Sequence, residues 1–213
     1  MNISTDAVAD FLSAHNLDPN LASEFVEFLR ADETRRGQQT DTRNIHDYLK
    51  SLSTDEVKDD LAKTRSNLVV AFYNVLGDFN LSSGIRNANW YNIEKVWIIG
   101  RKKWDRRGAV GSHNYIEVDH NPEIISVIDH YRARKYAIVS AEISDKSESI
   151  VHYPWNPNTF LIFGEEGAGV PQNILDRCDD IVHIPGRGSV RSLNVATTAG
   201  IFMHSYSAHI GLI

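Results

Sequence analysis

The stretch that decides the fold is LIFGEEGAGVP, residues 161–171. It begins as an apolar, strand-like run and continues into three glycines and two carboxylates. Glycines let a backbone approach a ligand closely, and open α/β sheets bind ligands where their strands end. The glycine spacing differs from that of a dinucleotide fingerprint, and no Gly-Lys-Ser/Thr follows as in a phosphate-binding loop. Taken alone, the stretch fits a tight turn as well as a ligand-binding loop.

Strand-like and helix-like segments alternate around this stretch. Residues 68–73, LVVAFY, form a β-branched and aromatic run that is typical of a buried strand. Such alternation predicts an α/β fold with a mainly parallel sheet, which we expect to occupy residues 65–213. The other predicted strands lie near 95–99, 115–118, 136–140, 158–163 and 180–184, and the predicted helices near 83–90, 121–134, 171–176 and 192–209.

The first 64 residues have a different character. They are acidic and polar, and Val8, Phe11 and Leu12 are spaced as in a short amphipathic helix. Residues 53–56, STDE, are typical of a capped helix start. We therefore predict that residues 1–64 form a small N-terminal helical extension. No Pro/Gly/Ser-rich linker separates it from the α/β domain, so we expect the two to pack together.

The composition favours one main domain in a reducing compartment. The chain has 213 residues, 42% of them hydrophobic and 23% charged, which is enough for one full core. Cys178 is the only cysteine, so no intramolecular disulfide can form. No apolar run approaches the roughly 20 residues that span a bilayer, and the N-terminal sequence shows no signal segment. We expect a cytoplasmic protein with no membrane partner.

One basic run stands out from a net charge of −6. The acidic balance argues against a general nucleic-acid coating protein, because phosphate binding rewards basic surfaces. Residues 101–107, RKKWDRR, nevertheless combine five cations with a tryptophan. Such a run is able to track phosphates and stack on a base, although charge runs also form ordinary solvated surfaces.

Two further segments place glycines and polar residues after a predicted strand. Residues 77–87, GDFNLSSGIRN, form a polar turn that enters a helix, which we expect Asn80 to cap. Residues 184–196, IPGRGSVRSLNVA, form a glycine-rich loop that enters another helix, where Ser192 and Asn194 lie beside free backbone amides. Each segment alone fits an ordinary capped helix.

Together and in this order, the three segments resemble the three motifs of the SpoU-class RNA 2'-O-methyltransferases of the SPOUT superfamily. The resemblance covers roughly residues 68–211. Arg187 and Arg191 depart from it, because many members carry small or apolar residues there. The spacing agrees within each motif: Asn80 to Arg86, Gly164-x-Glu166-Gly167-x-Gly169, and Ile184-Pro185 followed by Ser192-Leu193-Asn194.

The resemblance implies a fold, a methyl donor and an assembly. It implies a parallel α/β sheet with a C-terminal deep trefoil knot, S-adenosylmethionine as cofactor, and a homodimer. In that dimer the first motif of one subunit approaches the donor held by the other. Backbone groups of the second and third motifs would hold the cofactor. The candidate cofactor-binding residues are Phe163, Gly164, Gly169, Ile184 and Leu193.

The resemblance also assigns catalytic roles. Arg86 matches the arginine that acts on the target ribose. Because a guanidinium rarely loses its proton, we expect Arg86 to clamp the neighbouring phosphate and stabilise developing alkoxide charge. Asn80 would support Arg86, and Glu166 would orient either the loop or Arg86 itself. Ser192 and Asn194 would position the ribose and the knot backbone.

The predicted function is RNA 2'-O-ribose methylation, with transfer RNA preferred over ribosomal RNA as the substrate. One alternative is a catalytically silent dimer that binds S-adenosylmethionine and RNA, and another is an α/β enzyme with a different adenine ligand. No His-Glu-x-x-His or comparable cluster occurs, so no metal is expected. The candidate RNA-binding residues are Arg101, Lys102, Lys103, Arg106 and Arg107.

Overall fold

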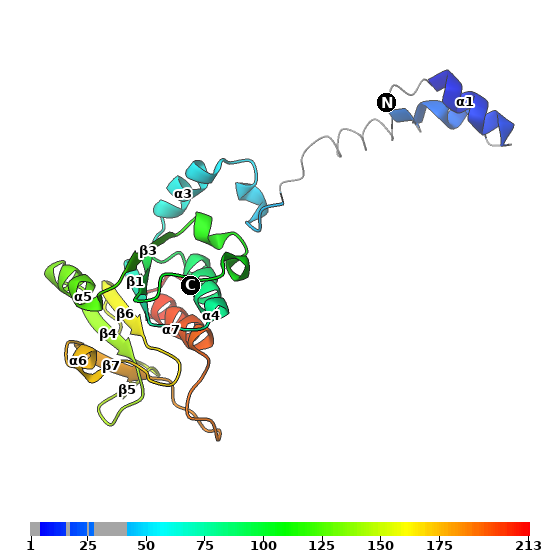
Figure 1. The fold of residues 1–213 in the computed structure, drawn as a ribbon. Helices are drawn as coiled ribbons and strands as arrows, with labels where there is room; N and C mark the ends of the chain where they lie inside the picture. The colour runs from blue at the N-terminus through cyan, green and yellow to red at the C-terminus, as the bar shows by residue number, and fades with distance from the viewer. Residues whose placement is uncertain (1–4, 16–17, 25, 28–41) are drawn as a thin grey trace. The chain divides into compact units, whose positions relative to one another are not determined.

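Seven strands form the centre of the computed structural model, which describes residues 5–15, 18–24, 26–27 and 42–213. Their order across the sheet is β3-β2-β1-β6-β4-β7-β5, and each neighbouring pair is parallel (Figure 1). The predicted mainly parallel α/β sheet is confirmed. The strands are β1 Leu68–Tyr73, β2 Lys95–Ile99, β3 Glu117–Asn121, β4 Ala137–Ala141, β5 Glu148–Ser149, β6 Thr159–Phe163 and β7 Asp180–His183.

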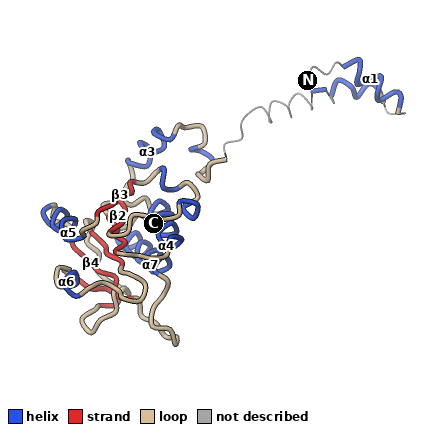
Figure 2. Tube along the Cα trace, viewed as in Figure 1, coloured by secondary structure: helices blue, strands red, loops and turns tan. Residues whose placement is uncertain are grey.

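Helices cover both faces of this sheet (Figure 2). Because side chains alternate along a strand, β1 contributes to two cores. Phe72 packs with residues of α4 and α7 on one face, and Val69 packs with residues of α5 and α6 on the other. The helices are α3 Thr54–Ala62, α4 Asp78–Trp90, α5 Ile124–Ala133, α6 Gln172–Leu175 and α7 Val195–His209.

The chain divides into two compact units, residues 1–43 and 44–213. In the first unit, α1 (Thr5–Ala14) precedes a short 3₁₀ turn at Pro19–Leu21. Val8, which the amphipathic pattern selected, is buried there with Ala22 and Val26. Residues 44–64 belong to the larger of these two units. The predicted domain boundary near residue 64 stays a prediction.

The segment 44–64 is attached to the sheet domain by α3 and a small core. Ser53 caps α3 by accepting a hydrogen bond from the Glu56 backbone N–H at 3.3 Å, and Glu56 accepts one in return from the Ser53 N–H at 2.8 Å. This capping box confirms the predicted helix start. Leu49 and Val57 are buried against Tyr115, which precedes β3. Residues 44–64 therefore form one wall of the larger unit.

Helix starts differ from the sequence prediction at three places, one of them α5, which begins at Ile124 rather than near residue 121. Helix α4 begins at Asp78 with Gly77 as its N-cap residue, so the expectation that Asn80 caps it is wrong. A carboxylate from another loop accepts hydrogen bonds from the N–H groups of Leu76 and Gly77, directly before this helix, as described below. Helix α7 begins at Val195 rather than near residue 192, because Asn194 is its N-cap.

Candidate active site

Side chains from all three sequence motifs meet where α4 and α7 begin. Asn80 Nδ2 donates to Glu166 Oε1 at 2.6 Å, and Asn80 Oδ1 accepts from Asn194 Nδ2 at 2.9 Å. The two partners are 86 and 114 residues away from Asn80 in sequence. We call Asn80, Glu166 and Asn194 the junction. One carboxamide in α4 thus fixes the second motif relative to the third.

Glu166 also holds the two residues that lead into α4. Its carboxylate accepts hydrogen bonds from the backbone N–H groups of Leu76 at 2.9 Å and Gly77 at 3.3 Å. Burial opposes the charged form of Glu166, but the hydrogen bonds from Asn80, Leu76 and Gly77 outweigh it and lower its pKa below the ordinary 4.5. Glu166 is therefore an ionised carboxylate at neutral pH. Of the two roles expected for it, the structure supports orientation of a backbone segment.

Asn194 plays the equivalent part at α7. Its Oδ1 accepts hydrogen bonds from the N–H groups of Ala196 at 2.9 Å and Thr197 at 3.3 Å, while its Nδ2 donates to Asn80 Oδ1. An asparagine N-cap satisfies amides that lack partners within the helix. The prediction that Asn194 lies beside free backbone amides is confirmed, and the same side chain links the two helix starts.

The glycines of the second motif shape their own loop. A Cβ atom at Gly164 would lie 2.4 Å from the carbonyl carbon of Gly169 and 2.6 Å from the nitrogen of Val170. Gly169 has a φ of +69°, and its N–H donates to the Glu165 carbonyl at 2.9 Å. Phe163 is 1% exposed and stacks on Phe72 in the core. Gly164 and Gly169 thus set the shape of the loop, and Phe163 packs in the core before it. None of these three candidate cofactor residues presents a side chain to a ligand.

A cavity of about 720 Å³ lies beside this loop, at the carboxyl ends of β4 and β7. We call it the β4–β7 cavity. Ile184, Ser192 and Leu193, all selected from the third motif, line it. Leu193 is 47% exposed, so an apolar surface is open to a ligand there. The cavity occupies the edge of the sheet where α/β folds bind small molecules.

Glu142 belongs to this cavity and was not selected from the sequence. It lines the cavity directly after β4. Its Oε2 accepts from the Val170 N–H at 2.9 Å, and its Oε1 accepts from the Ile143 N–H at 2.9 Å. Glu142 thus connects the second motif to the cavity wall. A carboxylate immediately after a predicted strand, at the edge where the motifs lie, was the signal that could have identified it.

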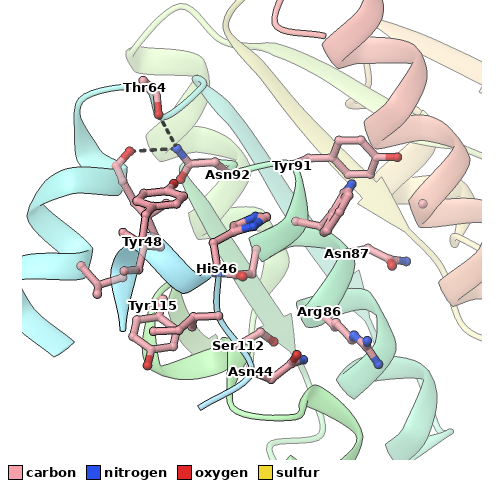
Figure 3. A pocket seen from close by; sticks show the side chains of 17 residues that line it. Asn44, His46, Tyr48, Thr64, Arg86, Asn87, Tyr91, Asn92, Ser112 and Tyr115 are labelled. Carbon is pink, nitrogen blue, oxygen red and sulfur yellow. Dashed lines mark hydrogen bonds between the residues drawn. The ribbon is translucent and has the colours of Figure 1, made fainter. Parts of the chain in front are cut away.

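Arg86 faces a different cavity, of about 690 Å³, which we call the Arg86 cavity (Figure 3). Asn44, Ser112 and Gly200 also line it. Thr198 and Phe202 of α7 line the β4–β7 cavity. At about 3.6 residues per turn, Gly200 lies on the opposite side of α7 from both. Within one chain, Arg86 therefore does not face the cavity formed by the third motif.

All five cations of the basic run are exposed, and two of them have a carboxylate partner nearby. Arg101 Nη1 donates to the Leu76 carbonyl at 3.1 Å, and its guanidinium lies 3.6 Å from an Asp78 carboxylate oxygen. Arg107 forms an ion pair with Asp105 at 2.6 Å. The three remaining cations of the run, Lys102, Lys103 and Arg106, are exposed. The structure thus distinguishes two exposed arginines with a carboxylate partner from three exposed cations that form no ion pair with the described residues.

Other site types find no support among the described residues. That part of the chain contains no cluster of three or more His, Cys, Asp or Glu side chains that could hold a metal ion. Burial raises the pKa of the Cys178 thiol to about 12, so it is not a thiolate at neutral pH. In the described segments, no helix has the length and apolar character needed to cross a membrane.

Comparison with known sequences assigns most of the sheet domain to one family. Residues 67–204 match the family model of the SpoU rRNA Methylase family. A tRNA (guanosine(18)-2'-O)-methyltransferase of Escherichia coli K12 is 25% identical over 147 residues, which cover 68% of this chain and 64% of that relative. A protein of the same description from Borreliella burgdorferi is 26% identical over 164 residues, covering 74% and 75% of the two chains.

Solved structures share the fold. The TrmH/SpoU tRNA modifying enzyme of A. aeolicus matches with a TM-score of 0.68 and 22% identity, over 76% of this chain and 86% of that one. The SpoU methyltransferase AviRb of Streptomyces viridochromogenes, solved in complex with AdoMet, matches with a TM-score of 0.60 and 23% identity, over 68% and 59% of the two chains. The sheet order and both helical layers therefore follow a known architecture.

Proposed function

Because the chain belongs to the SpoU rRNA methylase family, we propose that it is an RNA 2'-O-ribose methyltransferase that uses S-adenosylmethionine. The observation that carries this proposal is the junction, in which Asn80, Glu166 and Asn194 join the three motifs by direct hydrogen bonds. The names of the Escherichia coli and Borreliella burgdorferi relatives favour transfer RNA over ribosomal RNA as the substrate. We also propose a cytoplasmic location, which agrees with transfer RNA as the substrate.

The β4–β7 cavity fits the methyl donor. Its volume of about 720 Å³ lies within the range of about 300–1,000 Å³ that is usual for small-molecule pockets. Ile184 and Leu193 offer apolar contacts to an adenine ring, and residues 186–188 place glycine backbone at the rim. When bound, S-adenosylmethionine supplies an electrophilic methyl carbon. Gly164 and Gly169 act indirectly, by keeping the neighbouring loop in the shape that the cavity requires.

The positions of the two cavities support a homodimer. Arg86 and the β4–β7 cavity lie on opposite sides of α7 in one chain. A guanidinium that acts on the target ribose must lie close to the methyl donor, since alignment of the reacting groups controls such transfers. We therefore propose that Arg86 of one subunit serves the cavity of the other. A monomer would bind cofactor without transferring the methyl group.

The chain's own residues then divide the work of transfer. Arg86 clamps the phosphate beside the target nucleotide and stabilises charge that develops on the 2'-oxygen. Asn80 and Glu166 position Arg86 by fixing the first turn of its helix. Ser192 orients the ribose at the cavity rim, and Asn194 keeps the start of α7 in register with α4. Removal of the hydroxyl proton is either shared with Arg86 or passed to water.

We also propose that the C-terminal segment forms a deep trefoil knot and that residues 1–64 act as an N-terminal helical extension. For the knot, the support lies in the path of the chain after β7. Strand β7 neighbours the outermost strand β5, yet α7 returns to α4. The segment before β6 contacts α7: Trp155 Nε1 donates to Ser205 Oγ at 3.0 Å, and the Tyr206 hydroxyl donates to the Pro157 carbonyl at 2.5 Å.

A methyl-transfer assay tests the function. The protein is incubated with labelled S-adenosylmethionine and RNA that lacks native modifications, and the nucleosides are identified by mass spectrometry after nuclease digestion. We expect a 2'-O-methylnucleoside, formed in transfer RNA. Methylation of a base would contradict the ribose assignment. Cofactor binding without any transfer would contradict the assignment as an enzyme and favour a silent binding protein.

A further inference from the structure

We propose that the Arg86 cavity binds the base of an unpaired nucleotide of the substrate RNA. This inference rests on the function proposed above and adds a recognition site to it. Figure 3 shows side chains from several parts of the chain around this space, among them residues 44–48, helix α4 and the loop before β3. Residues 44–48 lie outside the family match at 67–204, so the family model does not account for their part of the cavity.

Three aromatic rings give the cavity its stacking surfaces. Tyr48 and Trp90 are 68% and 73% exposed, although both are large side chains that proteins usually bury. The His46 ring stacks on Tyr48, with centroids 5.7 Å apart and planes at 20°, and its centroid lies 6.4 Å from that of Trp90. Unpaired RNA bases are held by stacking on such rings. His46, Tyr48 and Trp90 form what we call the aromatic triad.

Amide side chains add hydrogen-bonding capacity beside the triad. Asn87 donates to the Ala196 carbonyl at 2.9 Å, so its amide is committed to the protein. Asn44 and Asn89 line the same cavity, and neither side chain has a hydrogen-bond partner among the described residues. A carboxamide offers both a donor and an acceptor, which is the pattern found on the edges of bases. The cavity therefore has groups free to read a base.

Arg86 identifies the ligand as a nucleotide rather than a neutral planar molecule. It lies four residues before Trp90 on α4, so the two side chains project from the same face of the helix. Arg86 is exposed, and no ion pair to it occurs in the described segments. A cation one helical turn from an open stacking surface matches a phosphate beside its own base. The function already places a phosphate at Arg86.

The wall of the cavity is fixed before any ligand arrives. Asn92, with a φ of +45°, donates from Nδ2 to the Leu61 carbonyl at 2.8 Å and to Thr64 Oγ1 at 3.1 Å. These bonds tie the end of α3 to the turn after α4. Leu49, Val57 and Tyr115 form a buried cluster that packs residues 49–57 against the loop before β3. A preformed site loses less entropy when a base enters.

Paired substitutions in the triad test the inference. Trp90→Leu and Tyr48→Leu remove a ring, whereas Trp90→Phe keeps one. We measure the Kd of an unmodified transfer RNA transcript by fluorescence anisotropy and the Kd of S-adenosylmethionine by calorimetry. Loss of stacking should weaken RNA binding about fivefold to 150-fold, while Trp90→Phe should stay within about threefold. Cofactor affinity should not change in any variant.

Val151→Ala is the matched control, because Val151 is 56% exposed and lies outside this cavity. Wild-type RNA affinity in both leucine variants would overturn the inference and leave the proposed function standing. Loss of self-association in Trp90→Leu, with unchanged RNA affinity per dimer, would also overturn it, since a second copy would then cover this face. If the wild-type protein binds no RNA, the proposed function and the inference fail together.

Discussion

The two cavities on either side of α7 are built in different ways. The β4–β7 cavity is bounded by glycine-rich backbone: a Cβ atom at Gly186 or Gly188 would meet nothing within 4 Å. The Arg86 cavity is bounded by long polar and aromatic side chains on preformed walls. The first suits a cofactor that is recognised through backbone groups, and the second suits a polymer that is recognised through charge and stacking.

Under the proposed function, this difference separates the methyl-donor site from the acceptor site within one chain. The junction is the link between them, because Asn80 and Asn194 stand at the starts of the two helices that carry the cavities. Changes on one side should therefore affect one substrate only, and changes at the junction should affect both. Substitutions in each cavity test whether the cofactor and the RNA are bound independently.

Arg86→Ala should have the largest effect. We expect the rate of methyl transfer to fall about 100- to 1,000-fold, as when a group that stabilises developing negative charge is removed. The Kd of S-adenosylmethionine should stay unchanged, because Arg86 lies outside the β4–β7 cavity. Single-turnover kinetics and calorimetry measure the two quantities. An equal loss of cofactor affinity would show that the two cavities are not separate.

Gly164→Leu should weaken cofactor binding at the β4–β7 cavity. The new side chain would collide with the backbone of Gly169 and Val170, and overpacking of this kind costs about 1–3 kcal/mol. If that cost falls on the bound shape of the loop, the cofactor binds about 10- to 100-fold more weakly. Calorimetry with S-adenosylmethionine tests this. Unchanged affinity in a variant with wild-type thermal stability would refute the role of the loop.

Asn80→Ala should lower stability by about 1–2 kcal/mol, because the partners Glu166 and Asn194 each lose a hydrogen bond. Urea unfolding measures the change. Both cofactor and RNA affinity should decline, since both cavities depend on the junction. A variant that loses affinity for only one ligand would show that Asn80 supports only one of the two cavities.

Glu166→Gln should give a difference in stability that depends on pH. The pKa of Glu166 is lowered in the folded state, so its contribution is complete above the ordinary value of 4.5 and is lost as the pH falls through the folded pKa. The gap between wild type and variant should be constant near neutral pH and shrink in acid below 4.5. Urea unfolding at several pH values follows it. A gap that persists unchanged at about pH 2 would contradict the assignment.

Gly188→Ala should have the smallest effect. Open space surrounds the position, so we expect the free energy of unfolding to change by less than about 0.5 kcal/mol. Gly164→Ala is the matched comparison, because its Cβ has no space. Thermal unfolding of both variants checks the contrast. Equal destabilisation would mean that the loop around Gly188 is packed.

The strands could be predicted because central parallel strands are apolar along their whole length. Residues 68–73 and 158–163 show this, and they became β1 and β6. The start of α4 could not be predicted, because the N-cap residue Gly77 is held by Glu166, which lies 89 residues away in sequence. Local sequence shows which residues are able to cap a helix, but it does not show which distant carboxylate will reach it.

The same limit applies to the site. Asn80, Glu166 and Asn194 were selected individually, while their mutual hydrogen bonds required the fold. The aromatic triad has no sequence signature, since His46 and Tyr48 precede α3 whereas Trp90 ends α4. Tryptophans usually pack in cores, so exposure of Trp90 emerged only when the surface was known.

Subunit complementation tests the central claim most directly. Heterodimers are formed between an Arg86→Ala chain and a Gly164→Leu chain, and transfer is measured at a cofactor concentration below the wild-type Kd, where each variant alone has little activity. If Arg86 serves the cavity of the other subunit, each heterodimer has one site with an intact arginine and an intact cavity. Random pairing of equal amounts should then restore about a quarter of wild-type methyl transfer, since half of the dimers are mixed. No recovery, although heterodimers are shown to form, would contradict the claim and place Arg86 and the donor in the same chain.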